Sequence, residues 1–471
     1  MMQQFFLLAR QEMALTLIIF ILLFIKVGAN EWSNKAIFKL VNVLLLINFL
    51  LGFFFVQDGM LFNEMFHTGK LVVTEKNILN LGTLIISLQA YDWLLQHKHI
   101  VEFYVLLLST LLGMFFMISA GNLLMFYLGL ELASIPLAAI ANFDLEKRLS
   151  SEGAMKFIIS SAFSSGLLLF GISMLYGTAG TLVFSELPQY LNGSPLQLFA
   201  LVLLVAGFAF KISVVPFHLW TADVYEGSPV TVSAYLSVIS KGAAVFVFVS
   251  VLYTVLKPLA QAWYVILFVL SVLTMLVGNL FALRQTNIKR LLAFSSIAQA
   301  GFILVGISGS SRSGMASVIY FILVYIFSNL GAFGVVGIVS ALTGKENIND
   351  YKGFYKTNPF LAWVMAISLF SLAGVPPAAG FFGKFFLLIA GAGKGNYTLI
   401  VIAALNMIIS LYYYLKLVRM MFIDRNEHEP ITTLPVHLYP KIALLVCMAG
   451  IILLGLVSGV YEYIYSLSTG V

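Results

Sequence analysis

Long apolar stretches, separated by short polar or Gly/Pro-containing breaks, follow one another along the whole chain. A bilayer core about 30 Å thick is crossed by about 20 apolar residues in helical conformation, close to the length of most of these stretches. The run VLLLINFLLGFFFV at 43–56 lacks the alternation of apolar and polar residues that β-barrel strands require. We therefore predict an all-α polytopic membrane protein of about fourteen transmembrane helices, at 13–27, 37–56, 72–95, 101–119, 121–142, 153–177, 196–221, 229–256, 260–283, 290–309, 314–342, 359–393, 397–423 and 440–467.

The loops between the predicted spans differ in charge, which tests the count. Cytoplasmic loops of membrane proteins hold the excess of Lys and Arg. Numbered along the chain, the odd loops contain fifteen Lys and Arg residues and the even loops four, and a miscounted span would scramble this asymmetry. We predict that the odd loops are cytoplasmic and that both termini are periplasmic, in a bacterial inner membrane. We expect the first span to be retained, because no basic segment directly precedes it.

Composition limits the chemistry that this chain can carry by itself. It is 61% hydrophobic and 10% charged, whereas soluble chains are about 25% charged, so a multi-domain soluble protein is excluded. Cys447 is the only cysteine, and no group of Cys and His has the spacing of an iron–sulfur, haem or zinc site. We predict no cofactor or metal in this chain. The net charge of +6 is explained by the basic loops.

Two predicted spans carry helix breakers. The span 359–393 would be about 52 Å long as one helix, and it contains Gly374-Val-Pro-Pro377, so we expect a break near mid-membrane. The span 196–221 contains Pro216, five residues after Lys211. Interrupted helices in two halves of a chain point to inverted repeats around a functional centre. The alternative is a simple proline kink.

Four charged residues fall far inside predicted spans. At 1.5 Å per residue, Glu131, Lys211 and Lys241 lie about 15, 22 and 18 Å from the start of their spans. Lys384 follows the double proline by seven residues. A charge at the centre of a transmembrane helix costs about 2.5–3.5 kcal/mol, so each of these residues requires a reason.

A lysine inside the membrane can carry protons. Removal from water makes the protonated form of a lysine less stable, and a nearby carboxylate makes that form more stable. An arginine, in contrast, keeps its proton. We predict that Glu131, Lys211, Lys241 and Lys384 form a proton or cation path. The alternative is a static buried ion pair that fixes helix register; one such residue would not distinguish the two, but four in one chain favour the path.

Four further residues give weaker signals. Lys156 lies three residues inside its span, where snorkelling to the surface explains it better than a relay role. Lys416 lies deeper but near a basic end, and function and snorkelling explain it equally well. His218 and Gln299 are candidates for extending a hydrogen-bonded water chain, although each residue is more often a satisfied packing residue.

Four long segments carry a family resemblance: GNLLMFYLGLELASIPL at 121–137, KISVVPFHLWTADVYEGSPVTVSAYLSVISKGAA at 211–244, NIKRLLAFSSIAQAGF at 287–302 and SLAGVPPAAGFFGKF at 371–385. With them the chain, from about residue 70 onward, is similar to the antiporter-like subunits of respiratory complex I, the proton-pumping NADH:quinone oxidoreductase. Within that superfamily, PFHLWTADVYEGSPV resembles the subunit N branch, the bacterial counterpart of mitochondrial subunit 2.

The resemblance implies roles for the matching positions. Glu131 matches the glutamate of the family's fifth helix, Lys211 the lysine of the broken seventh, and Lys241 the central lysine of the eighth. Lys384 matches the lysine of the broken twelfth helix, which leads towards the far side. Gln299 stands where relatives often have His, and because Gln takes no proton near neutral pH, we expect water-mediated transfer there. We also predict a switching pair, in which withdrawal of Glu131 lets Lys211 pass its proton on.

The resemblance also implies an organisation and an assembly. Three helices in 1–100 would precede two inverted five-helix repeats, at 101–256 and 260–423, with helices 7 and 12 broken, and one helix in 424–471 would follow. The expected partners are other complex I membrane subunits, both antiporter-like and small, in the lipid bilayer and without nucleic acid. FMN, iron–sulfur clusters and quinone would belong to partner subunits.

Three other functions compete with a proton-translocating subunit. A subunit of a multi-subunit cation/proton antiporter or of a membrane-bound hydrogenase belongs to the same superfamily. A solute transporter working alone would need a roomy pocket with substrate-binding side chains, where the sequence offers a series of lysines. A structural membrane scaffold leaves the four buried charges unexplained.

Overall fold

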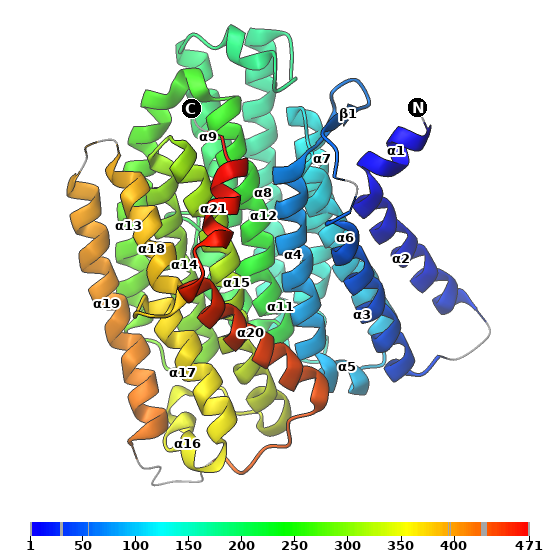
Figure 1. The fold of residues 1–471 in the computed structure, drawn as a ribbon, viewed down its shortest axis with the longest axis vertical. Helices are drawn as coiled ribbons and strands as arrows, with labels where there is room; N and C mark the ends of the chain where they lie inside the picture. The colour runs from blue at the N-terminus through cyan, green and yellow to red at the C-terminus, as the bar shows by residue number, and fades with distance from the viewer. Residues whose placement is uncertain are drawn as a thin grey trace.

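The computed structural model describes residues 2–28, 32–54, 56–393, 395, 397–424 and 431–469 as an almost entirely helical bundle with one small hairpin (Figure 1). The hairpin consists of the antiparallel strands β1, Gly59–Leu61, and β2, Phe66–Thr68. The helices are α1 Met2–Leu8, α2 Arg10–Val27, α3 Asn34–Leu51, α4 Lys70–Gln89, α5 Tyr91–Gln96, α6 Ile100–Ile118, α7 Leu123–Ala141, α8 Arg148–Ala179, η1 Leu187–Tyr190, α9 Pro195–Ile212, α10 Leu219–Gly227, α11 Val230–Tyr235, η2 Leu236–Ser240, α12 Lys241–Thr254, η3 Lys257–Leu259, α13 Ala260–Ala282, α14 Ile288–Ser308, α15 Arg312–Thr343, η4 Ile348–Tyr351, α16 Phe354–Thr357, α17 Pro359–Ala373, α18 Ala379–Ala392, α19 Tyr397–Phe422, α20 Leu438–Leu456 and α21 Gly459–Leu467.

Among the described residues, twelve helices are long and apolar enough to cross a membrane. This confirms an all-α polytopic membrane protein. The two other predicted spans fall on α2, which carries Arg10, Glu12 and Lys26, and on the shorter apolar pair α17 and α18. The last predicted span was too long: α20 ends at Leu456, because Val457 is extended and the helix is interrupted before Gly459.

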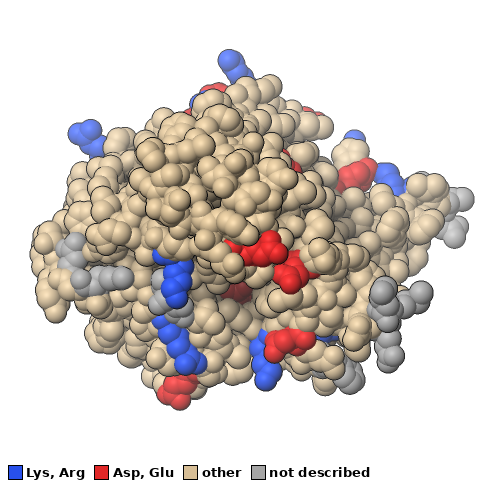
Figure 2. All heavy atoms as spheres, turned by 90° about the horizontal axis from the view of Figure 1, so that it is seen from above, with Lys and Arg blue, Asp and Glu red and all other residues tan. Residues whose placement is uncertain are grey.

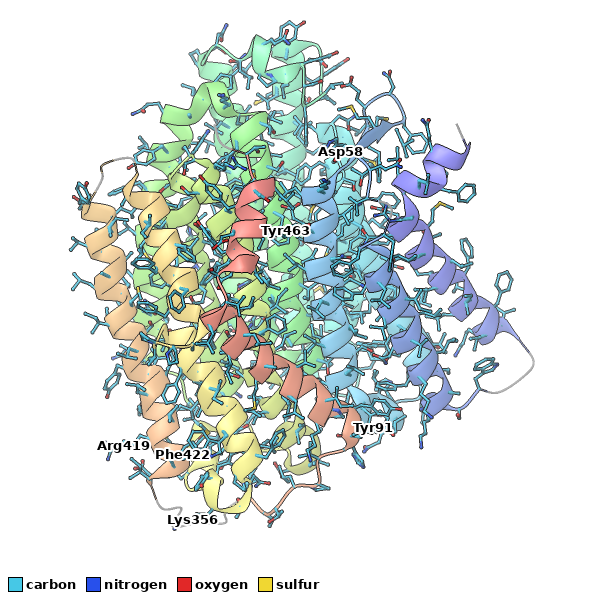
Figure 3. All side chains as sticks on the ribbon, in the orientation of Figure 1. Asp58, Tyr91, Lys356, Arg419, Phe422 and Tyr463 are labelled. Atoms are coloured by element: carbon cyan, nitrogen blue, oxygen red, sulfur yellow. The ribbon has the colours of Figure 1, made fainter. Side chains whose placement is uncertain are left out.

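Contacts at the two ends of the bundle distinguish one end from the other. At one end, residues at the helix ends beside odd loops and in those loops contact one another: Lys26 pairs with Glu102 at 2.7 Å, and Asp92 contacts His437 at 2.5 Å. At the other end, Ser185 of loop 6 donates a hydrogen bond to Glu64 of loop 2 at 2.9 Å. In Figure 3, Asp58 of loop 2 lies towards the upper end, and Lys356 and Arg419, which flank odd loops, lie at the lower end. We call these ends the even-loop face and the odd-loop face. Their contacts fit the alternation that fourteen crossings require.

Two pairs of helices meet at turns inside the bundle. The helix α9 ends at Ile212, and Ser213 takes a left-handed conformation with φ of 67° before α10 begins at Leu219. The helix α17 ends at Ala373, where Gly374 has φ of 85°, and α18 begins at Ala379. Each turn frees the last backbone carbonyls of its first helix from helical hydrogen bonds. That each pair forms one broken membrane span within an inverted repeat stays a prediction.

The helices α12, α14 and α15 form the most enclosed part of the bundle. Every residue in the most apolar window of α14 is buried, and 89% of the corresponding windows of α11–α12 and α15 are buried. Polar groups on these helices are therefore shielded from water, and a polar group that lacks a hydrogen-bond partner there is energetically costly. Lys241 on α12 and Gln299 on α14 lie in this part, with exposed fractions of 3% and 1%.

Candidate functional site

Lys211 lies in the last turn of α9 and reaches two hydroxyl groups on neighbouring helices. Its Nζ donates hydrogen bonds to Ser134 Oγ on α7 at 2.6 Å and to Ser161 Oγ on α8 at 2.9 Å. It also lies 5.7 Å from the ring centroid of Phe210. The ammonium group is thus held by neutral oxygens at the junction of three helices.

Glu131 lies one helical turn before Ser134 on α7, close enough to Lys211 for the two charges to interact. The described structure contains no ion pair between them, and Glu131 Oε1 is buried without a hydrogen-bond partner. The structure therefore brings the predicted pair into one region but does not join it. The switching role stays a prediction.

Lys241 begins α12 directly after the wide π-helical turn η2. Its Nζ donates a hydrogen bond to Ser296 Oγ on α14 at 2.7 Å and lies 5.5 Å from the ring centroid of Tyr225. π-helical turns recur at functional sites because they displace side chains from the regular helical register. The segment LSVIS at 236–240 contains no Gly or Pro, so this turn could not be predicted from helix-breaking residues.

His218 stands immediately before α10, at the turn that follows Lys211. Its Nδ1 is buried without a hydrogen-bond partner, and the ring is close enough to Lys241 for an electrostatic interaction. The structure thus brings His218 near Lys241 at the turn that follows Lys211, and its relay role stays a prediction.

Lys384 on α18 turns back to the end of α17. Its Nζ donates to the Leu372 carbonyl at 2.7 Å and approaches the Ala373 carbonyl at 3.4 Å. Gln299 Nε2 donates to the same Leu372 carbonyl at 3.0 Å. Lys384 is 1% exposed and lies 4.9 Å from the ring centroid of Phe302. The carboxyl end of a helix carries partial negative charge, so the turn after α17 favours a cation here.

A row of hydroxyl groups, which the sequence analysis missed, lies between Lys241 and Lys384. Tyr414 contacts Ser295, and Gln299 Nε2 donates to Tyr414 Oη at 3.3 Å. Tyr325 Oη is buried without a hydrogen-bond partner. A cavity of about 10 Å³, near the room that one water molecule needs, is bounded by Gln299, Phe321, Val324, Tyr325, Ser328, Ser371, Leu372, Gly380 and Lys384. The paired serines of AFSSIAQ, one turn before Gln299, were the available signal.

The two weaker lysine candidates lie outside this interior group. Lys416 is exposed on α19. The Lys156 side chain is 44% exposed and pairs with Glu152 at 2.8 Å and with Asp223 at 2.6 Å. Desolvation opposes ionisation of Asp223, but hydrogen bonds from Lys156 and Arg290 lower its pKa below the usual value. This surface network ties the beginnings of α8 and α14 to α10.

The part of the chain that the structure describes contains no group of three or more His, Cys, Asp or Glu residues placed to hold a metal ion. Cys447 is buried and free. The interior of the described structure holds the series of lysines, hydroxyl groups and one imidazole described above.

Comparison with known proteins gives this arrangement a family. Residues 120–410 match the family described as NADH:quinone oxidoreductase/Mrp antiporter, TM. The NADH-quinone oxidoreductase subunit N of Phocaeicola vulgatus is 49% identical over 460 residues, which cover 96% of each chain. A chain of respiratory complex I from Thermus thermophilus superposes with a TM-score of 0.82 at 27% identity, covering 98% of this chain and 100% of that one.

A chain of the Mrp complex from Dietzia sp. shares the fold, with a TM-score of 0.83 at 19% identity, covering 97% of this chain and 95% of that one. At that identity the likeness concerns the fold alone, whereas the relative from Phocaeicola vulgatus shares about half of its residues over nearly its whole length. The chain therefore belongs to the NADH:quinone oxidoreductase/Mrp antiporter family of membrane subunits, in its NADH-quinone oxidoreductase subunit N branch.

Proposed function

We propose that this chain translocates protons as a membrane subunit of NADH:quinone oxidoreductase, along Glu131, Lys211, Lys241 and Lys384. One observation supports this most strongly: none of the three lysines forms an ion pair in the described structure. Their partners are hydroxyl and carbonyl oxygens. A carboxylate partner would hold a lysine in its charged form, whereas neutral oxygens leave both protonation states accessible.

The proposed path begins where Glu131 and Lys211 interact. Movement of the carboxylate towards or away from the ammonium group changes how tightly Lys211 holds its proton. At 4 Å two unit charges attract by about 4 kcal/mol at an effective dielectric of 20, so a modest movement has a large effect. His218, with its unpartnered Nδ1, then offers the next acceptor on the way to Lys241.

The second half of the path runs from Lys241 to Lys384. Ser296 accepts the hydrogen bond of Lys241, and Tyr414 and Gln299 lead to the carbonyl that Lys384 also contacts. Gln299 takes no proton near neutral pH, so its role is to orient hydroxyl groups or a water molecule. Lys384 is the proposed release end, and Lys156 and Lys416 lie off the path.

The remaining expectations concern the assembly. We propose that both termini face the periplasm of a bacterial inner membrane and that the partners are the other membrane subunits of the complex. FMN, iron–sulfur clusters and quinone would be held by partner subunits. We also propose that 101–256 and 260–423 are the two inverted repeats, between three helices in 1–100 and one in 424–471. The two interrupted helix pairs, one in each proposed repeat, support that division.

The test is proton translocation per NADH oxidised in a reconstituted complex that carries Lys384→Ala. We expect translocation to fall severalfold while the complex still assembles, because the release end has lost its only titratable group. Arg419→Ala is the control, since Arg419 is exposed and pairs with Asp424 at 3.5 Å near the odd-loop face. Normal translocation by an assembled Lys384→Ala complex would remove this residue from the path.

A further inference from the structure

A second group of buried charges lies on α2 and α4, away from the proposed path. Lys76 Nζ and Glu12 Oε1 are 2.5 Å apart, and their side chains are 1% and 3% exposed. Ser119 Oγ donates to the same Glu12 oxygen at 3.4 Å. Arg10, two residues before Glu12 on α2, donates to the backbone carbonyls of Leu51 and Leu7. The Glu12–Lys76 pair is therefore internally neutral.

Glu75, next to this pair, is the buried acid that remains. It is 5% exposed, and the described structure gives it no hydrogen bond or ion pair. It lines a cavity of about 570 Å³ between α4, α6, α12 and the hairpin. An unpaired buried carboxylate costs several kcal/mol, so Glu75 needs either a proton or a cation.

The cavity opens on the even-loop face. Its walls come from 58–75, 117–121, 184–185, 246–254 and 466–469, together with Met315. In Figure 2, which looks onto this face, acidic side chains gather around a hollow near the middle. Glu75 therefore lies at the inner end of a space that reaches the surface of the molecule.

The other charged groups in the cavity wall lie nearer its mouth. Asp58 Oδ1 accepts a hydrogen bond from the backbone N–H of Lys70 at 3.3 Å, and Glu64 accepts one from Ser185. Burial lowers the pKa of His67. The charge of Asp58 raises this pKa, and the charge of Lys76 lowers it further. In the described part of the wall, α6, α12, α15 and α21 contribute no charged side chain. Lys70, at the beginning of α4, also lines the wall, and Lys76 interacts electrostatically with Glu75 but forms its ion pair with Glu12.

The inner end of the cavity also lies near the proposed path. Glu75 and Leu79 are one turn apart on α4, and a Cβ on Gly242 would lie 3.4 Å from Leu79 Cδ2. Gly242 directly follows Lys241, and Phe246 and Val247, one turn further along α12, line the cavity. One helical turn is about 5.4 Å, so only a thin apolar layer between α4 and α12 separates the cavity from the level of Lys241.

We infer that Glu75 is a proton-exchanging carboxyl group, which connects the interior of this chain with the even-loop face in addition to the proposed release end at Lys384. The inference rests on the proposed proton translocation and adds a site to it. The ligand is a proton, because Glu75 is the one carboxylate of the described wall that accepts no hydrogen bond, and the described residues contain no group of three or more His, Cys, Asp or Glu placed to hold a metal ion.

The first test is labelling with dicyclohexylcarbodiimide in the assembled complex. The reagent takes the proton of a protonated carboxylic acid and adds its carboxylate, and the adduct rearranges to a stable N-acylurea, which mass spectrometry locates. We expect an adduct at Glu75 that declines as the pH rises from 5 to 9. The matched control is Glu186, an exposed acid on the same face that accepts a hydrogen bond from Thr181 at 2.6 Å, where we expect no adduct.

The second test is proton translocation in Glu75→Gln and Glu186→Gln complexes at equal assembly. We expect Glu75→Gln to lower translocation at least twofold and Glu186→Gln to leave it unchanged. Three results would overturn the inference: no adduct at Glu75 while another buried carboxyl group in the sample is labelled, protection of Glu75 by Na⁺ but not K⁺ at constant pH, or full translocation by Glu75→Gln. The labelling does not depend on pumping, so it fails or succeeds separately from the proposed function.

Discussion

The substitution Lys211→Arg separates a proton-carrying lysine from a structural one. It keeps a positive charge beside Ser134 and Ser161, which accept hydrogen bonds from Lys211 at 2.6 and 2.9 Å. In water arginine holds its proton more tightly than lysine by about 2–3 pKa units, about 3–4 kcal/mol. Release of the proton should therefore slow by about 100-fold or more, and we expect pumping to fall below a tenth of normal.

The larger guanidinium group brings a second effect, which the assay must separate. It has five N–H donors, and the two serines satisfy only some of them, so unsatisfied donors would cost about 1–3 kcal/mol each. Assembly must therefore be measured alongside pumping. The control is Lys289→Arg, because Lys289 is also buried but pairs with Glu346 at 3.0 Å, an interaction that arginine can replace.

The assay is proton translocation per quinone reduced in liposomes that contain the purified complex. The expected result is a Lys211→Arg complex that assembles and reduces quinone but pumps poorly, with normal pumping by Lys289→Arg. Full pumping by an assembled Lys211→Arg complex would refute the carrier role, because an arginine at this position cannot release its proton on the timescale of turnover. Lys211 would then be a fixed structural charge.

Two other predictions follow from the same contacts. Ser296→Ala removes the hydroxyl group that accepts the hydrogen bond of Lys241. A hydrogen bond to a charged group contributes about 1.5–3 kcal/mol. We therefore expect the rate of pumping, measured in the same liposomes, to change at least tenfold. In a Cys447→Ser background, a membrane-impermeant maleimide added to intact cells should label Asp58→Cys, on the even-loop face, but label Lys356→Cys only after the membrane is opened; the reverse pattern would mean that the orientation is inverted.

The features that could be predicted from the sequence depend on the length of apolar stretches and on the cost of placing a charge inside the membrane. Span positions, the loop asymmetry and the four deep charges all follow from the low tolerance of the bilayer core for polar groups. The enclosed positions of Lys241 and Lys384 confirm that depth was a good guide to burial. The distance between Glu131 and Lys211 could not be predicted from the sequence, because it depends on how α7 and α9 pack.

The features that were missed depend on contacts between helices. Ser134 and Ser296 look like ordinary small residues in apolar helices until a lysine from another helix reaches them. Lys76 stands near the beginning of its predicted span, where a lysine usually snorkels to the surface, so its position in the sequence does not mark it as buried. The hairpin and α2 cover that end of α4, and Glu12 pairs with Lys76 there.

The buried lysines of this chain fall into two chemical groups, and the difference bears on function. Lys76 and Lys289 each contact a carboxylate, which favours the charged form at all times and suits a fixed structural pair. The Nζ atoms of Lys211, Lys241 and Lys384 donate hydrogen bonds only to neutral oxygens in the described structure, so no carboxylate in direct contact fixes them in the charged form. A lysine in such surroundings loses its proton more easily than a lysine that is paired with a carboxylate. A moving charge such as Glu131 can therefore decide between the two states, which a lysine already paired with a carboxylate would resist.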